Sequence, residues 1–152
     1  MEQANRIMTP DTIFQLCNAI AMIGWIILIV LPMWHSSDKF IIGIIVTLFA
    51  IIYTYYILTN LSALDLKSFG SLKGVTALFT NPLAVLIGWV HYLAFDLMVG
   101  IWIKRNSLKY GISHWLIIPC LLLCFMLGPV GLLLYLLIRF IKTRDYFSLN
   151  YN

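Results

Sequence analysis

The composition of this 152-residue chain excludes an ordinary soluble domain, because 62% of its residues are hydrophobic, only 11% are charged, and its mean hydropathy is +0.95. Ten lysines and arginines outnumber six acids, which gives a net charge of +4. These basic residues are dispersed along the chain and do not form the continuous patch that nucleic acid selects. We therefore expect an integral membrane protein that does not bind nucleic acid.

Four apolar runs are each near the twenty or so residues that a helix needs to cross the hydrocarbon core of a bilayer. We expect the first run to be a retained helix, because it is about twice as long as the apolar region of a typical signal peptide. Short polar connections join the first two runs and the last two. The sequence predicts an all-α domain covering residues 1–152, with four transmembrane helices at about 12–34, 40–61, 83–103 and 115–141.

The longest gap between these spans runs from Ser62 to Pro82. It predicts an amphipathic helix lying in the membrane interface, with a re-entrant segment or a surface loop as alternatives. At its end, Asn81 is placed to cap the third span and Pro82 to occupy its first helical position. The apolar side chains that carry the helical spacing are Phe69, Leu72, Val75 and Phe79.

Lysines and arginines near the ends of the spans decide the orientation of a membrane protein. Four spans place six of them on the side of both termini, against four on the other side. This slight excess favours both termini in the cytoplasm, and the positive charge indicates anchoring to anionic membrane lipid. The six are Arg6, Lys67, Lys73, Arg139, Lys142 and Arg144, and the four are Lys39, Lys104, Arg105 and Lys109.

All three cysteines, Cys17, Cys120 and Cys124, fall within predicted spans. Cys120 and Cys124 share a helix face, and a soft metal site with a histidine is one interpretation. Packing residues at helix contacts are the other, and it is favoured because the sequence has neither a C-x-x-C nor a His-x-x-x-His spacing. We expect no metal and no cofactor.

Asp96 is the most informative residue of the chain, because a carboxylate at the centre of a spanning helix costs roughly 2.5 to 3.5 kcal/mol. His91 lies five residues earlier, about 140° around the helix and about 7.5 Å along it, so the two cannot pair directly. Either they reach separate partners on neighbouring helices, or they line two sides of one cavity. Asp96 belongs to a stripe with Gly88, Tyr92 and Gly100, whose glycines predict a closely packed neighbouring helix.

The functional hypothesis makes His91 and Asp96 the catalytic pair of an intramembrane cavity. The structural alternative is that Asp96 is a hydrogen-bonded link between helices and His91 a satisfied core histidine. Partners available for that alternative are Asn18, Tyr53, Tyr55, Tyr56 and Tyr135. Candidate residues lining a cavity are Trp89, Tyr92, Asn81, Gly88, Pro129 and His114.

The fourth predicted span contains the run from Gly128 to Gly131, which reads Gly-Pro-Val-Gly. Pro129 cannot donate a backbone hydrogen bond, and its ring crowds the preceding turn, so we expect a kinked helix. Backbone groups freed in a membrane must be satisfied by protein or by a water-lined cavity. The kink is therefore expected to face the interior of the bundle, although a kink with a packing role alone is the other interpretation.

The chain resembles the abscisic-acid-deficient, or neoxanthin-synthase-like, family of small integral membrane proteins. The resemblance rests on residues 81–84, on the pattern Trp-x-His-x-x-x-x-Asp-Leu at residues 89–97, and on the run at residues 128–133, and it covers roughly residues 12 to 141. It implies a connection to carotenoids, since plant members are needed to convert the epoxide violaxanthin to the allenic neoxanthin. No plastid transit peptide is recognisable, and the segment around Asn81 and Pro82 differs from the plant pattern. We therefore expect a bacterial-type member in the inner membrane that acts on another polyene or has another role.

Such a reaction is a net isomerisation that needs one group to protonate the epoxide oxygen and another to accept a proton from carbon. The resemblance makes Asp96 and His91 candidates for these tasks, since burial in apolar surroundings would favour the neutral form of each side chain. A non-enzymatic protein that binds a carotenoid, lipid or quinone is one alternative. A small proton-linked transporter is another, and with four helices it would need to assemble as a homo-oligomer.

Overall fold

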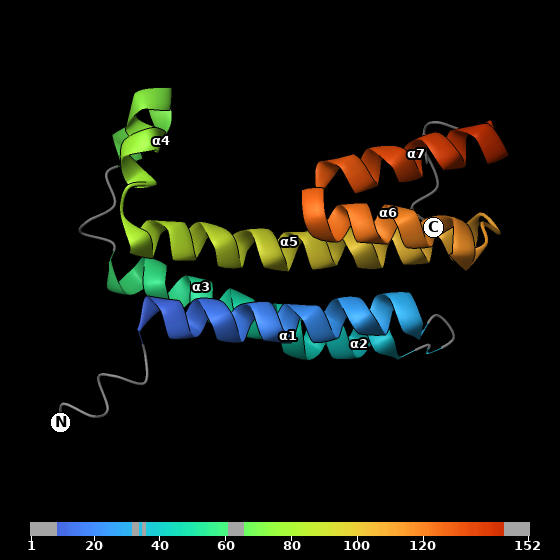
Figure 1. Cartoon of the computed structure of the whole chain (residues 1–152), viewed down its shortest axis with the longest axis horizontal. Coiled ribbons are helices and arrows are strands. Elements are labelled where there is room, and N and C mark those ends of the chain that lie inside the picture. The colour runs from blue at the N-terminus through green and yellow to red at the C-terminus, as the bar shows by residue number, and fades with distance from the viewer. Residues whose placement is uncertain (1–8, 32–33, 35, 61–65, 145–152) are drawn as a thin grey trace.

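The computed structural model describes residues 9–31, 34, 36–60 and 66–144. Within these ranges all regular secondary structure is helical, which confirms the all-α part of the predicted fold class. Three long helical segments lie side by side, and two shorter helices pack on one half of the bundle (Figure 1).

The first long helix, α1, runs from Pro10 to Val30. It begins where the Thr9 hydroxyl accepts a hydrogen bond from the backbone N–H of Thr12, and Pro10 occupies the first helical position. The second is a continuous helical segment, Ser37–Thr59, in which the chain changes its winding twice. It comprises α2 (Ser37–Phe40), a π-helical stretch η2 (Ile41–Val46) and α3 (Thr47–Thr59).

The third long helix, α5 (Pro82–Lys109), is the centre of the molecule and contacts α1, η2, α3, α6 and α7. Its start confirms the predicted cap, because the Asn81 side-chain oxygen accepts a hydrogen bond of 2.9 Å from the backbone N–H of Leu83. With 28 residues, α5 is about 42 Å long, which exceeds the roughly 30 Å of hydrocarbon in a bilayer.

Among the described residues, these three helices are long and apolar enough to cross a membrane. They correspond to the first three predicted spans, with boundaries that differ by a few residues. The three cysteines expected to be packing residues are free and buried, Cys17 on α1 and the other two on α6 (His114–Leu127).

The prediction of a single kinked fourth span from Trp115 to Ile141 is wrong. The chain forms two helices there, α6 and then α7 (Pro129–Thr143), which pack closely against each other. Figure 1 shows α6 running back along α5 and α7 returning beside it. The two helices therefore form a hairpin whose tip is the single residue between them, Gly128.

Two glycines explain why the chain turns back instead of kinking. Gly128 has φ 47° and ψ −95°, a conformation that side chains disfavour, and Pro129 then starts α7 as its first residue, where no backbone N–H is needed. Gly131 lies where the two helices touch. A Cβ atom at Gly131 would lie 2.6 Å from Cα of Cys124, and closer still to the Cys124 nitrogen and the Cys120 carbonyl oxygen.

The hairpin enters and leaves at the same end of the bundle. We call this the α2 end, because it contains the starts of α2 and α6 and the last turns of α1, α5 and α7; the other is the α4 end (Figure 1). With 14 residues, α6 is about 21 Å long, too short to cross about 30 Å of hydrocarbon. Its tip reaches the middle of α5, near Asp96.

The segment expected to be an interfacial helix contains two short helical pieces at the α4 end, the 3₁₀ turn η4 (Leu66–Gly70) and α4 (Leu72–Leu78). Ser71 caps α4 by accepting a hydrogen bond from the N–H of Gly74. Residues 62–65 of the predicted segment lie outside the described residues. With seven residues, α4 is shorter than the predicted periodicity, and its placement in the membrane interface stays a prediction.

Candidate functional site

Two apolar cavities meet at His91, on the face of α5 that packs against α3. The larger, of about 430 Å³, lies between η2, α3 and α5, and the smaller, of about 260 Å³, lies between α3, α4 and α5. Tyr53 and His91 line both cavities. We call the two together the α3–α5 groove.

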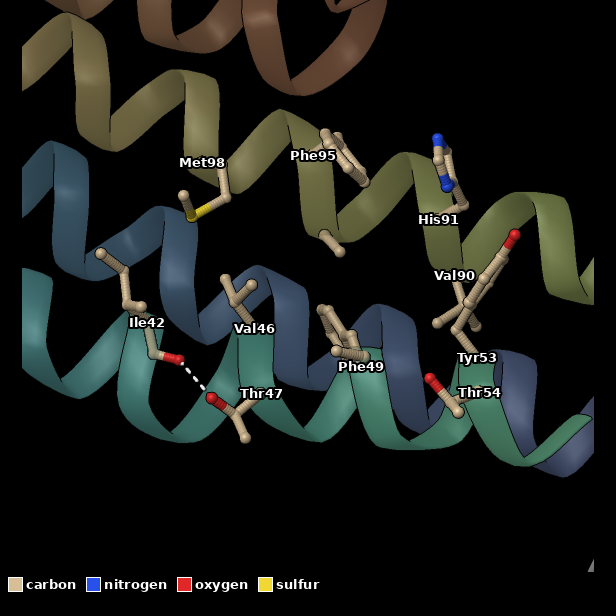
Figure 2. A pocket seen from close by; sticks show the side chains of 12 residues that line it. Ile42, Val46, Thr47, Phe49, Tyr53, Thr54, Val90, His91, Phe95 and Met98 are labelled. Atoms are coloured by element: carbon tan, nitrogen blue, oxygen red, sulfur yellow. Dashed lines mark hydrogen bonds between the residues drawn. The ribbon is translucent and has the colours of Figure 1, made fainter. Parts of the chain in front are cut away.

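The larger cavity is bordered by the π-helical stretch of the second long helix. At the end of this stretch the carbonyl of Ile42 accepts a hydrogen bond from the backbone N–H of Thr47 and a second one, of 2.8 Å, from the Thr47 hydroxyl (Figure 2). π-Helical turns occur frequently at functional sites. The lining is almost wholly apolar, with Val46, Phe49, Ala94, Phe95 and Met98 among its residues.

His91 is exposed at the groove and is held between aromatic rings. It stacks on Phe95, one turn later on α5, with ring centroids 4.5 Å apart and an interplanar angle of 27°. Tyr53 reaches across from α3, with its ring centroid 5.7 Å from that of His91 (Figure 2). An imidazole and a phenol therefore lie together in a groove whose other lining residues are apolar except for Thr47 and Thr54.

The smaller cavity extends the groove toward the α4 end. Phe69, Val75 and Phe79 from the connecting segment line it, together with Ala84 and Gly88 from α5 and three further apolar residues. The two cavities follow α5 from Ala84 to Met98, a distance of fourteen helical steps or about 21 Å. The groove is thus long and narrow.

Asp96 lies away from this groove and faces the tip of the α6–α7 hairpin. A Cβ atom at Gly128 would lie 3.0 Å from its Oδ1 atom, and the Cys124 thiol of α6 donates a hydrogen bond of 3.8 Å to its backbone carbonyl. Its Oδ2 atom is buried and has no hydrogen-bond partner among the described residues. The carboxyl group therefore lies at the point where the hairpin turns.

The structure does not bring Asp96 and His91 together. His91 lines both cavities of the α3–α5 groove and Asp96 lines neither, and the two residues are about 140° apart around α5. Of the two arrangements that the sequence left open, the described structure corresponds to separate partners on neighbouring helices.

Trp89 and Tyr92 also lie outside the groove and connect α5 to other helices. Trp89 donates a hydrogen bond of 3.0 Å from its indole N–H to the side-chain oxygen of Asn18 on α1. The Tyr92 hydroxyl donates one of 3.3 Å to the carbonyl of Phe125 on α6. Both contacts hold neighbouring helices in register.

The remaining predicted residues divide between cavity and scaffold. Gly88 lines the smaller cavity, where the ring of Phe79 approaches it. Asn81 caps α5, and Pro129 begins α7. His114 begins α6, and its Nε2 atom donates a hydrogen bond of 2.9 Å to the carbonyl of Ile29 in the last turn of α1. Of the six candidates for lining a cavity, only Gly88 lines the α3–α5 groove.

A buried charge cluster at the α2 end was not anticipated from the sequence. Lys104 is 4% exposed, and its Nζ atom donates a hydrogen bond of 2.6 Å to the Ser37 hydroxyl and lies 3.7 Å from Oδ1 of Asp38. Arg105 donates one of 2.6 Å from Nε to Oδ2 of Asp38. One carboxylate therefore binds two consecutive cations and ties the start of α2 to α5.

A second polar cluster fixes α7 to α5 at the same end. The side-chain oxygen of Asn106 accepts hydrogen bonds from the Tyr135 hydroxyl at 2.6 Å and from Nη1 of Arg139 at 3.2 Å. The Arg139 guanidinium also lies over the ring of Tyr110, 5.5 Å from its centroid. Gly131, Tyr135 and Arg139 recur every four residues, and they form the buried face of α7.

Tyr53 is the groove residue that sequence reasoning placed only among general hydrogen-bonding partners. Its position opposite His91 depends on the register between α3 and α5, for which a single sequence carries no signal. The π-helical stretch also leaves no periodic signature in the uniformly apolar run Ile41–Val46.

A family model described as ABA DEFICIENT 4-like matches residues 12–135. This match spans the three long helices, the whole α3–α5 groove, α6 and the first half of α7. Neither the comparison with curated proteins nor the comparison with solved structures gives a match.

Proposed function

Because the chain belongs to the ABA DEFICIENT 4-like family, we propose that it is a membrane protein of carotenoid metabolism that binds a carotenoid or similar polyene in the α3–α5 groove and isomerises it. Membership by itself suggests a membrane protein related to carotenoids or abscisic acid. The isomerase activity and the residues that perform it are our proposal. We place the protein in a bacterial inner membrane.

The shape of the α3–α5 groove is the observation that supports this proposal most. It follows about 21 Å of α5, and its lining is almost wholly apolar. An extended hydrocarbon chain fits such a groove, since its burial needs no polar partners along its length. The groove is open to the surface of the bundle, so a polyene dissolved in the bilayer can enter from the side.

The proposed chemistry uses His91 and Tyr53, the two side chains that line both cavities of the groove. In an epoxide isomerisation, a C–O bond of the ring breaks as its oxygen gains a proton, while a nearby carbon loses a proton and a new C=C bond forms. We assign His91 as the base that accepts the proton from carbon and Tyr53 as the acid that protonates oxygen. A proton passed from His91 to Tyr53 restores both groups, so no redox cofactor is required.

Asp96 takes a different part in this proposal from the one that the sequence suggested. Its carboxyl group lies at the hairpin tip and cannot reach a substrate that contacts His91 in the groove of the same chain. We propose that it positions the hairpin against the middle of α5. The hypothesis that Asp96 is catalytic makes the opposite prediction for its amide variant.

The test uses membranes from cells that produce epoxy-carotenoids, with pigment conversion measured by chromatography. General acid–base groups contribute about 10²- to 10⁴-fold to rates, so His91→Asn and Tyr53→Phe are each expected to lower turnover at least about 100-fold. His114→Asn, a histidine outside the groove, is the matched control and should keep turnover. Full turnover by His91→Asn would reject its role as base.

Asp96→Asn separates the two assignments of Asp96. If His91 and Tyr53 catalyse the reaction in the α3–α5 groove, this variant should keep most of its turnover once it is folded in mild detergent. Loss of turnover in a folded Asp96→Asn variant, with an active His91→Asn variant, would instead support catalysis at the hairpin tip.

Binding is measured independently of turnover by purifying the protein in mild detergent and recording its visible absorption spectrum. Ala50→Trp fills the larger cavity and is expected to remove a co-purifying polyene band. Leu133→Trp adds the same side chain to an exposed position on α7 and should leave the band intact. A polyene band without conversion by the unmodified protein would indicate a binding protein in place of an isomerase.

A further inference from the structure

The α6–α7 hairpin divides the basic residues between the two ends of the bundle differently from the four spans that the sequence predicted. Because α6 and α7 return to the α2 end, the cations of α7 join those of α2 and α5. Of the cations among the described residues, the α4 end keeps only Lys67 and Lys73. The α2 end holds seven, namely Lys39, Lys104, Arg105, Lys109, Arg139, Lys142 and Arg144.

We propose that the α2 end faces the cytoplasm and binds the anionic headgroups of the inner leaflet. Lysine and arginine are concentrated on the cytoplasmic side of membrane proteins, and that leaflet carries negative surface charge. Four spans would divide the same nine described cations five against four, so seven against two is a much stronger asymmetry. The start of α1 and the end of α7 then lie on opposite sides of the membrane, whereas the sequence placed both termini in the cytoplasm.

Six of the seven cations at the α2 end are of two kinds. Lys104 and Arg139 are buried, and Arg105 pairs with Asp38, so the protein itself holds these three. The side chains of Lys39, Lys142 and Arg144 are exposed and belong to the rim of this end. Asp38 is the one acid of this end within the described residues, so the exposed rim is strongly positive.

Two tryptophans independently place this end at headgroup level. Trp34, between α1 and α2, is 40% exposed, and Trp115, in the first turn of α6, is 81% exposed. Tryptophan is enriched where hydrocarbon meets the headgroups, because its ring is apolar and its N–H is polar. Exposed cations and exposed indole rings at the same end of the bundle match the charge and polarity of an anionic lipid interface.

The topology is tested by labelling single cysteines with a membrane-impermeant maleimide, in a variant whose three native cysteines are replaced by alanine. Ala77→Cys reports on the α4 end and Lys142→Cys on the α2 end, and both positions are exposed. We expect Ala77→Cys to be labelled in intact spheroplasts and Lys142→Cys only after permeabilisation. Labelling of both from one side would overturn the hairpin topology, and the reverse pattern would overturn the orientation.

The lipid contact is tested by thermal unfolding of the purified protein in detergent. Phosphatidylglycerol should raise the unfolding midpoint relative to phosphatidylcholine. Replacing Lys39, Lys142 and Arg144 by glutamine should remove that rise, whereas the control Lys67→Gln/Lys73→Gln should keep it. Soluble glycerol phosphate at equal concentration should give no rise, because it lacks the acyl chains that bring the headgroup to the rim.

Three results would refute the lipid contact. Equal midpoints in the two phospholipids would show that anionic headgroups are not bound. A rise that survives the triple substitution would place the contact elsewhere. A rise with glycerol phosphate alone would identify a site for a soluble anion instead of a lipid surface.

Discussion

Replacing Gly131 by alanine is expected to open the α6–α7 hairpin. The added methyl group would lie 2.6 Å from Cα of Cys124 and closer still to the Cys124 nitrogen and the Cys120 carbonyl oxygen. Ordinary contacts between carbon atoms are about 3.5 to 4.0 Å. Because the obstructing atoms belong to the backbone of α6, they cannot move aside by a change of rotamer.

The free-energy cost of Gly131→Ala follows from these distances. The helices must separate by about 1 Å or more to restore normal contact distances at Cys124. Overpacking usually costs about 1 to 3 kcal/mol, and a contact between backbones belongs at the upper end of that range. About 3 kcal/mol shifts the equilibrium between a closed and an open hairpin by roughly 150-fold.

The reactivity of the cysteines reports the opening directly. Cys120 and Cys124 are buried in α6 beside Gly131, whereas Cys17 is buried on α1. In Gly131→Ala, maleimide should label Cys120 and Cys124 much faster, while the labelling of Cys17 stays unchanged. Mass spectrometry of the labelled peptides separates this local opening from global unfolding, which would expose all three thiols.

Gly43→Ala is the matched control, because a Cβ atom at that position meets nothing within 4 Å. It should leave the labelling of all three thiols unchanged and stabilise the protein slightly, since alanine is favoured over glycine in a helix by about 0.5 to 1 kcal/mol. Labelling rates in Gly131→Ala equal to those of the unmodified protein would refute the close contact between α6 and α7.

Two further predictions concern the polar clusters at the α2 end. Asn106→Ala removes the acceptor shared by Tyr135 and Arg139 and should destabilise the protein by about 2 to 3 kcal/mol, measured as a lower unfolding midpoint in detergent; an unchanged midpoint would contradict this anchoring role. Asp38→Asn leaves the buried Lys104 without its counter-charge and should cost about 3 kcal/mol in the same assay, a loss that Asp38→Glu should partly restore.

The sequence by itself determined the helical fold, the three long spans and the start of α5. These features depend on local properties: the length and hydropathy of a run, and the capping side chain of Asn81 followed by Pro82. It also determined that His91 and Asp96 lie on different sides of α5, because the angle between them follows from helix geometry alone.

The tertiary structure decided between a kinked span and a hairpin. Residues 115–141 have the composition of a spanning helix in either case, and the run from Gly128 to Gly131 is compatible with both. The choice depends on the backbone contact at Gly131 and on the hydrogen bonds that Asn106 accepts from Tyr135 and Arg139 of α7, which join residues distant in the sequence.

The same contacts decided the surroundings of both candidate residues. Tyr53 reaches His91, and the hairpin tip reaches Asp96, only because of how α3 and α7 pack on α5. Because of the hairpin, the cations of α7 lie at the α2 end of the bundle, whereas a single fourth span would have placed them at the α4 end. Periodicity, capping and hydropathy depend on neighbouring residues and are readable in one chain, whereas register and packing depend on which distant surfaces fit together.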